Sequence, residues 1–265
     1  MRTLRVFVSI LAVISVVATV FLWARSIEMN EKPVITCSVD GDLQVKCSVT
    51  DKELLKYVTA TDGRDGDITS KVVIERKKFF VSKGITTINY AVCDSDNNVT
   101  KLSKNLHFTD YHAPRFTLKN DLISYINNPI DFANSIGAYD AYDGDISDRV
   151  KIISSTYSST VSGKYDIDCK VTNSFGDTSE IVFKAIVLDG NPDASRIRLK
   201  DYIIYTTVGE QPDFAANISD FNGNAEKQLE INTDDYNPDK AGVYSVYYEV
   251  SGRIETRVLV VVEEL

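Results

Sequence analysis

Histidine, tryptophan and methionine are scarce in this chain of 265 residues, which holds two, one and two of them respectively. His107 and His112 lie at a predicted strand end and in a linker, with no nucleophile motif nearby and no helical metal-pair spacing. The sequence also lacks a glycine-rich phosphate loop and a nucleophile elbow. We therefore expect a protein that is not an enzyme and that has no organic cofactor.

Basic residues are in short supply outside the N-terminus. Arg2, Arg5 and Arg25 are the basic residues of the first 25, which contain no acid, so residues 26–265 carry 26 basic and 38 acidic residues and a net charge of −12. A folded part this acidic repels a phosphate backbone, and we expect no nucleic-acid partner.

Charged residues are absent from residues 6–23, where the only polar groups are three hydroxyls. At about 1.5 Å per residue this run reaches about 27 Å, enough to cross the hydrocarbon core of a bilayer. Trp23 stands at its edge, where interfacial aromatics belong. A cleaved signal peptide is the alternative, but Leu22 two residues before Ala24 makes a poor cleavage site. The sequence favours an uncleaved anchor in the lipid bilayer.

The flanking charges indicate the orientation of this anchor only weakly. Arg2 and Arg5 flank one side, and Arg25 and Lys32 lie close on the other, so the positive-inside rule gives almost a tie. The downstream sequence has an extracellular character, and it decides the orientation. We expect a single-pass protein of the cell membrane with its C-terminal domains outside.

Internal repetition is the strongest feature of the chain. A short motif begins at Asp62, Asp140 and Ser219, at offsets of 78 and 79 residues. About twenty residues after each copy comes a second shared block that begins with glycine. The three blocks span Gly84–Val92, Gly163–Val171 and Gly242–Val250. Self-similarity at a period near 79 predicts three tandem domains of one fold.

Each block has the period of a half-buried strand. Val246, Tyr248 and Val250, for example, alternate with more polar residues, and a turn and a second alternating run follow. Each copy therefore closes with a hairpin, and several short strands in about 80 residues predict a two-sheet sandwich. The chain divides into an inner tail and transmembrane helix (1–25), a juxtamembrane linker (26–32) and three domains (33–112, 113–190 and 191–265).

These motifs carry a family resemblance over residues 33–265. The segments Ala60–Thr69 and Gly84–Val92, with the Asp110…Pro114 exit, resemble bacterial immunoglobulin-like surface repeats, a module also found in some pesticidal crystal proteins. The second copy matches better, and the third departs, with Asn222 and Asn224 for two of the Asp residues. The resemblance implies a mainly β chain of three tandem immunoglobulin-like sandwiches after one transmembrane helix, in an extracellular setting. It implies no activity.

Two clusters of carboxylates are candidate metal ligands. They are Asp62, Asp65 and Asp67 in the first copy and Asp140, Asp143 and Asp145 in the second. Oxygen ligands of this kind suit Ca²⁺. The same residues also suit a structural turn, because Asp and Asn side chains cap nearby backbone N–H groups. The third copy has Asn at two of these places, which a turn tolerates better than a calcium site, so we favour the turn.

Four cysteines in an exported chain could form two disulfides. Cys37 and Cys47 flank Asp40-Gly41-Asp42, a hairpin-turn signal, and a bridge across that hairpin is one hypothesis. Cys169 takes an inward strand position and predicts a buried thiol, whereas Cys93 belongs at the edge of a turn.

The sequence thus favours a membrane-anchored bacterial surface protein without catalysis. Its domains would act in binding or adhesion to a cell-surface protein or polysaccharide ligand, or as a spacer. One alternative is an accessory subunit that pairs with another membrane or exported protein. Another is a carbohydrate-binding module.

Overall fold

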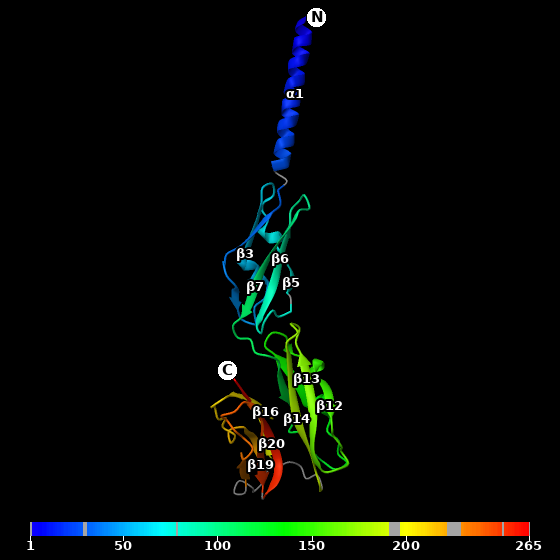
Figure 1. Cartoon of the computed structure of the whole chain (residues 1–265), viewed down its shortest axis with the longest axis vertical. Coiled ribbons are helices and arrows are strands. Elements are labelled where there is room, and N and C mark those ends of the chain that lie inside the picture. The colour runs from blue at the N-terminus through cyan, green and yellow to red at the C-terminus, as the bar shows by residue number, and fades with distance from the viewer. Residues whose placement is uncertain are drawn as a thin grey trace. The chain divides into compact units, whose positions relative to one another are not determined.

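A computed structural model describes residues 2–28, 31–77, 79–190, 197–221, 229–250 and 252–264. These residues form two compact units, Met1–Tyr111 and His112–Leu265. Figure 1 shows one long N-terminal helix followed by strands. We keep the names first, second and third repeat for residues 33–112, 113–190 and 191–265.

The N-terminal helix α1 spans Arg2–Glu28. Its segment Val6–Ala24 has a mean hydropathy of 2.7, and none of it is buried against the protein. By length and composition this helix could cross a membrane, and a signal sequence would pass the same test.

The first repeat consists of two sheets. One has the order β1–β3–β4 and the other β2–β7–β6–β5. Their bounds are β1 Val34–Cys37, β2 Leu43–Val45, β3 Val58–Asp62, β4 Gly66–Asp67, β5 Val73–Lys77, β6 Ile85–Cys93 and β7 Val99–Phe108. Short helices connect them: α2 Asp51–Leu54, η1 Leu55–Tyr57 and η2 Thr69–Lys71.

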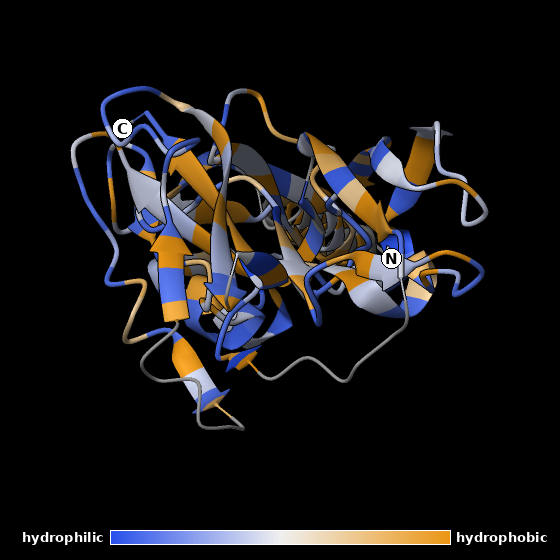
Figure 2. Cartoon of the chain, turned by 90° about the horizontal axis from the view of Figure 1, so that it is seen from below, coloured by the Kyte–Doolittle hydropathy of each residue, from blue (hydrophilic) through white to orange (hydrophobic). Residues whose placement is uncertain are grey.

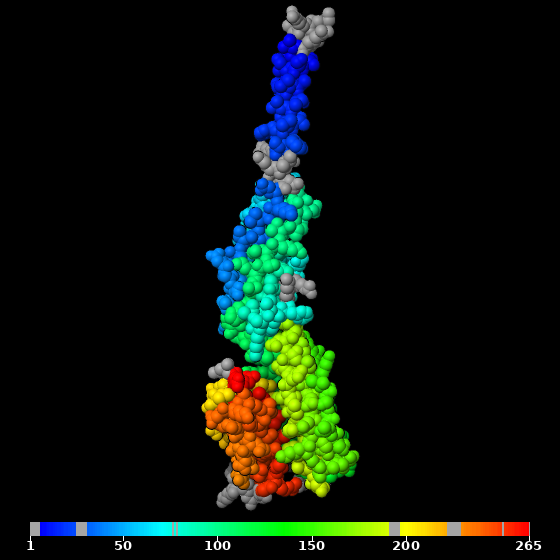
Figure 3. Space-filling model, viewed as in Figure 1, coloured from blue at the N-terminus to red at the C-terminus, as the bar shows by residue number. Residues whose placement is uncertain are grey.

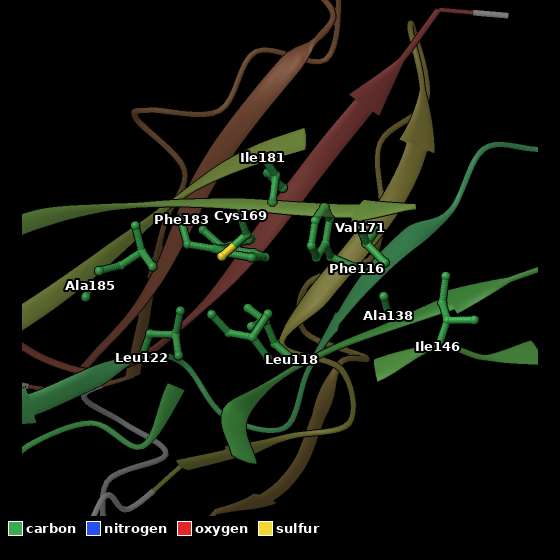
Figure 4. Close-up of a cluster of buried hydrophobic side chains, with 13 residues drawn as sticks. Phe116, Leu118, Leu122, Ala138, Ile146, Cys169, Val171, Ile181, Phe183 and Ala185 are labelled. Atoms are coloured by element: carbon green, nitrogen blue, oxygen red, sulfur yellow. The ribbon is translucent and has the colours of Figure 1, made fainter. Parts of the chain in front are cut away.

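The second repeat has the same plan. Its sheets have the orders β11–β10–β8 and β12–β13–β14–β9. Their bounds are β8 Arg115–Leu118, β9 Ile123–Tyr125, β10 Ile136–Asp140, β11 Gly144–Asp145, β12 Lys151–Ser155, β13 Gly163–Thr172 and β14 Thr178–Leu188, with α3 Phe132–Ser135 and η3 Ser147–Arg149. Phe116 and Leu118 from one sheet meet Cys169 and Phe183 from the other in its core (Figure 4).

The third repeat is described with two sheets, β15–β17 and β16–β20–β19–β18. Their bounds are β15 Ile197–Leu199, β16 Ile203–Thr207, β17 Ile218–Phe221, β18 Leu229–Asn232, β19 Gly242–Val250 and β20 Arg253–Glu263. The motif copy at 219–225 lies partly outside the described residues, and the linker at 191–196 lies wholly outside them.

Three features recur in every repeat. The glycine-led block forms a hairpin with the next strand, as β6–β7, β13–β14 and β19–β20. A short strand pairs in parallel with the second strand of that hairpin, as β2–β7, β9–β14 and β16–β20. The inward positions predicted for β19 are confirmed, because Val246, Tyr248 and Val250 are buried. Tyr247, predicted to face water, is buried as well, beside Lys164 of the second repeat. Figure 2 shows the banding of hydrophobic and hydrophilic residues along the strands. The expectation of a mainly β, immunoglobulin-like fold behind one N-terminal helix is therefore confirmed.

Candidate functional site

The first carboxylate of each acidic motif closes a tight turn. Asp62 Oδ1 accepts hydrogen bonds from the backbone N–H groups two and three residues further on, both at 2.8 Å. Asp140 Oδ1 accepts the equivalent pair at 2.9 Å each. Asp67 and Asp145 likewise accept from the N–H two residues on, at 2.9 Å. The glycine before each of these has a φ of 72° and 76°, as such a turn requires.

The middle carboxylate of each motif binds the turn of the hairpin. Asp65 accepts from the backbone N–H and the hydroxyl of Ser95 at 2.8 and 2.6 Å, and Asp143 accepts from the same two groups of Ser174 at 2.7 Å each. A basic side chain six residues after each Asp completes the contact, at 3.1 and 2.6 Å. The middle Asp therefore ties the acidic loop to the hairpin.

These contacts lower the pKa of both carboxyl groups. The hydrogen bond from the Ser95 hydroxyl is the main cause for Asp65, and its pKa falls to about 2. Burial raises the pKa of Asp143, but the hydrogen bonds from Ser174 and Arg149 outweigh that and the net direction is down. In the described part of the chain, no three His, Cys, Asp or Glu side chains converge to hold a metal ion. The structural turn, rather than a calcium site, stays the favoured prediction for these loops.

The hairpin expected between Cys37 and Cys47 is not formed. Cys37 ends β1 and Cys47 follows β2, and these strands belong to different sheets, since β1 pairs with β3 and β2 pairs with β7. No disulfide links any of the four cysteines, all of which lie in the described part of the chain. Cys169 is buried and Cys93 is exposed, as their strand positions predict.

The second and third repeats pack against each other within the unit His112–Leu265. On β20, Val258, Val260 and Val262 face the core of their own sandwich. The alternate residues Leu259 and Val261 turn the other way and join the apolar cluster of the second repeat. Figure 3 shows this packing, with the third repeat in orange and red against the second in green.

Polar contacts fix the register of this packing. The Tyr205 hydroxyl accepts from the backbone N–H of Phe116 at 2.8 Å and lies 3.2 Å from its carbonyl oxygen. The guanidinium of Arg115 lies 4.9 Å from the centre of the Tyr205 ring and makes an ion pair with Glu263 at 2.5 Å. Sequence reasoning missed this interface. Its signal was the apolar Leu259 and Val261 on the face of β20 that a lone sandwich would expose to water.

Arg257 lies in the same interface with only 1% of its surface exposed. Its Nε atom donates to the carbonyl oxygen of Asp121 at 3.2 Å, whereas Nη1 and Nη2 are buried without a hydrogen-bond partner among the described residues. Burial lowers the pKa of this guanidinium. The burial of these two nitrogens without hydrogen bonds makes Arg257 a costly feature of the contact.

A groove of about 740 Å³ lies over the outer face of the β12–β13–β14 sheet. Strands of the second repeat supply its floor, and Val243 at the start of β19 in the third repeat lines it as well. The side-by-side packing of the two repeats therefore helps to build it. Its lining residues are Ile153, Asp166, Asp168, Cys169, Glu180, Ile181, Val182, Lys184 and Val243. We name it the sheet-face groove.

A second groove, of about 590 Å³, lies in the first repeat. It is lined mainly by polar side chains together with one aromatic residue, Tyr57. Its lining residues are Ser38, Gln44, Val45, Lys46, Ser48, Val49, Glu53, Lys56 and Tyr57. We name it the first-repeat groove.

No protein-family model matches the chain. A curated relative is the pesticidal crystal protein Cry22Aa of Bacillus thuringiensis, which is 29% identical over 206 residues. The match covers 73% of this chain and 27% of that protein, so the chain spans just over a quarter of its relative. The expected likeness to pesticidal crystal proteins is thus supported, but membership of a particular surface-repeat family is not shown.

Two solved structures illustrate the structural likenesses. The CBM51-2 domain in complex with GlcNAc and the INT domains of Clostridium perfringens ZmpB are 22% identical, with a TM-score of 0.24, over 57% of this chain and 26% of that one. The protocadherin GammaB4 extracellular domain is 14% identical, with a TM-score of 0.22, over 89% of this chain and 51% of that one.

Proposed function

We propose that this protein is anchored in the cell membrane by Val6–Ala24 and binds a ligand outside the cell without catalysis. The anchor is supported by a helix segment of 19 residues with a mean hydropathy of 2.7. At about 1.5 Å per residue it reaches about 28 Å, close to the thickness of the hydrocarbon core. Binding is supported by one observation above all, the sheet-face groove, which combines an open concave shape with exposed aliphatic side chains.

The location can be tested through Cys93, which is an exposed free thiol on β6. A membrane-impermeant maleimide added to intact cells should label the full chain, and a Cys93→Ser variant should lose most of the label. Labelling that requires cell lysis would place the repeats inside and contradict the proposal. Retention of the chain in the membrane fraction after salt washing distinguishes the anchor from a cleaved signal peptide.

The groove can be tested with two matched valines. Val182 lines the sheet-face groove and is 45% exposed, whereas Val208 lies outside it and is 43% exposed. Cells that display the full chain should adhere to a surface coated with cell-wall polysaccharide or cell-surface protein. Val182→Asp should lower that adhesion about tenfold, because a charge then replaces an apolar contact. Val208→Asp should leave it unchanged, and equal behaviour of the two variants would remove the groove from the proposal.

A carbohydrate is a second candidate ligand, favoured by the first-repeat groove. Hydroxyl, amide and carboxylate groups surround Tyr57 there, and sugars are bound by such polar groups beside an aromatic ring. A glycan array probed with the full chain in nanodiscs tests this. Binding that disappears in Tyr57→Ala but persists in Val182→Asp would assign the sugar site to the first repeat.

A further inference from the structure

The outward side chains of the β13–β14 hairpin form a ladder of charges on the floor of the sheet-face groove. Asp166 is paired with Lys184, and Lys170 is paired with Glu180 at 2.7 Å. Between these two ion pairs lies Asp168, whose strand partner on β14 is Val182. Each end of the ladder is therefore neutralised by a cross-strand pair.

Asp168 differs from the charged residues on either side of it. It accepts a hydrogen bond from the Ser154 hydroxyl, and it makes no ion pair with any basic side chain in the described part of the chain. A carboxylate between two neutralised pairs attracts a positive group more strongly than its neighbours do. Among the described residues that line the groove, Asp168 is thus the carboxylate whose charge no basic side chain neutralises.

Aliphatic side chains surround that charge. Ile153 on β12 is 57% exposed, Val182 on β14 is 45% exposed and Val243 on β19 is 44% exposed. Ile153 lies at a β-bulge, where the pairing of β12 with β13 shifts between Ile152 and Ser154. Exposed aliphatic groups gathered in a concave surface from three strands are typical of a binding site for another molecule.

The chemistry of the groove selects among possible occupants. A divalent cation would need about six oxygen ligands, and one unpaired carboxylate does not supply them. A sugar would favour an aromatic platform, and the residues that line this groove include none. A second copy of this acidic chain would bring carboxylates together and is disfavoured by repulsion. A cationic and partly aliphatic partner complements both properties of the surface.

We propose that the sheet-face groove binds an extended peptide segment of a partner protein that carries a lysine or arginine beside an aliphatic residue. The cation pairs with Asp168, and the aliphatic side chain covers Val182 and lies between Ile153 and Val243. In an extended segment, side chains two residues apart point to the same side, about 7 Å from each other. This proposal rests on the proposed binding function and names the chemistry of the ligand.

The experiment uses three fluorescein-labelled octapeptides and the full chain in nanodiscs of phosphatidylcholine, a lipid without net charge. The first peptide is Lys-Ser-Val-Ser repeated twice, which places lysine and valine on one side. The second has glutamate for lysine, and the third has serine for valine. Fluorescence anisotropy should show the first peptide binding about tenfold more tightly than either of the others, with an affinity that falls as salt rises.

Two variants locate the site. Asp168→Asn keeps an acceptor for Ser154 but removes the charge, and it should weaken the lysine–valine peptide about tenfold. Asp148→Asn removes an exposed carboxylate from the same repeat without an ion pair in the described structure, and it should leave binding unchanged. Equal binding of the lysine and glutamate peptides, or equal effects of the two variants, would overturn the proposal.

The failure of this inference can be told from the failure of the proposed function. If the peptides do not bind but Val182→Asp still abolishes adhesion, the groove takes a ligand of different chemistry and only the inference falls. If neither the peptides nor adhesion depends on the groove, both proposals fall.

Discussion

Asp62 and Asp140 occupy equivalent places but have different surroundings. The Asn173 side chain donates to Asp140 Oδ2 at 3.0 Å. In the first repeat the residue at the place of Asn173 is Asp94, which has no amide to donate. Asp62 Oδ2 is accordingly buried without a hydrogen-bond partner among the described residues. The two copies thus differ by one donor, and an unpaired buried oxygen is destabilising.

This difference predicts that the double change Asp94→Asn with Asn98→Asp stabilises the first repeat. The new amide at position 94 can donate to Asp62 Oδ2 as Asn173 does to Asp140, and the negative charge moves to position 98, where the second repeat has Asp177. Asn can keep accepting from the backbone N–H groups of residues 96 and 98, as Asp94 does now, and the change at position 98 removes the amide that now donates to Asp94 Oδ2 at 2.9 Å. The melting temperature of the first repeat should rise by about 2–5 °C. The converse variant Asn173→Asp should lower the melting temperature of the second repeat. Melting temperatures that stay unchanged in both variants would contradict this prediction.

Two tyrosines form the same buried hydrogen bond in different repeats. The Tyr90 hydroxyl donates to the carbonyl oxygen of Leu54 at 3.0 Å, and the Tyr248 hydroxyl donates to that of Phe214 at 2.8 Å. The second repeat has the apolar thiol of Cys169 at this place. Burial raises the pKa of Tyr90 and of Tyr248 to about 12.

A pH dependence follows from the raised pKa values. Below pH 10 both phenols are neutral in the folded and unfolded chain, so their contribution to stability is complete. Between pH 10 and 12 the phenols ionise first in the unfolded chain, and stability falls. Tyr90→Phe should lower the free energy of unfolding by about 1 kcal/mol near neutral pH. It should also reduce the fall in stability between pH 10 and 12, which chemical denaturation at several pH values measures. Tyr139→Phe, at an exposed position, is the control and should change neither the stability at neutral pH nor its fall at alkaline pH.

At the scale of elements, the acidic loop and the hairpin hold each other in place. Asp143 receives hydrogen bonds from the Ser174 N–H and hydroxyl and an ion pair from Arg149, all with distances of 2.7 Å or less. Its oxygens are therefore already engaged before any metal arrives. A cation would have to displace these donors to bind.

We therefore expect calcium to leave the melting temperature unchanged. We also expect Asp143→Ala to lower the free energy of unfolding of the second repeat by about 1–3 kcal/mol. Hydrogen bonds lower the pKa of Asp143 in the folded chain. Its contribution to stability is therefore complete above about pH 4, the pKa of a free Asp side chain, and is lost as the pH falls through the lower pKa of the folded state. Calorimetry with calcium or with chelator, across this pH range, measures both effects. If calcium raises the melting temperature and Asp143→Asn abolishes that rise, the loop is a metal site.

The elements themselves were predictable because their signals are local. The two-residue alternation of Gly242–Val250 and the turn after it gave the hairpin β19–β20 directly. The tie between Asp143 and Ser174 was not predictable, since 31 residues separate them and only the folded sandwich brings them together. The hairpin proposed for Cys37 and Cys47 failed for the same reason, because a local turn signal does not reveal that the chain crosses to the other sheet.

At the scale of the molecule, the unit His112–Leu265 depends on a contact between two repeats that each have their own core. The sequence suggests three equivalent copies, but the outer face of β20 has Leu259 and Val261 where the register places Asn105 and His107 on β7. Leu259 and Val261 are explained only by the second repeat that covers them. The sheet-face groove depends on the same contact through Val243, which is why it could not be found in any single repeat.

This contact makes opposite predictions for two neighbouring side chains on β20. Leu259→Asp places a charge in an apolar cluster and should lower the stability of the unit by about 3 kcal/mol or more. Arg257→Met removes a buried guanidinium whose two terminal nitrogens have no hydrogen-bond partner in the described part of the chain, and it should raise stability by about 1–3 kcal/mol. Arg149→Met is the control, because that arginine is paired with Asp143 and half exposed, so its loss should not stabilise.

Hydrogen exchange measured by mass spectrometry shows where each change acts. In Leu259→Asp, exchange should rise at Arg115–Leu118 and at Ile203–Thr207, the strands joined by the Tyr205 hydrogen bond. In Arg257→Met the same segments should exchange more slowly. If Arg257→Met instead destabilises the unit and speeds exchange, the guanidinium has partners that stabilise it, and the packing of the two repeats depends on charge as well as on Leu259 and Val261.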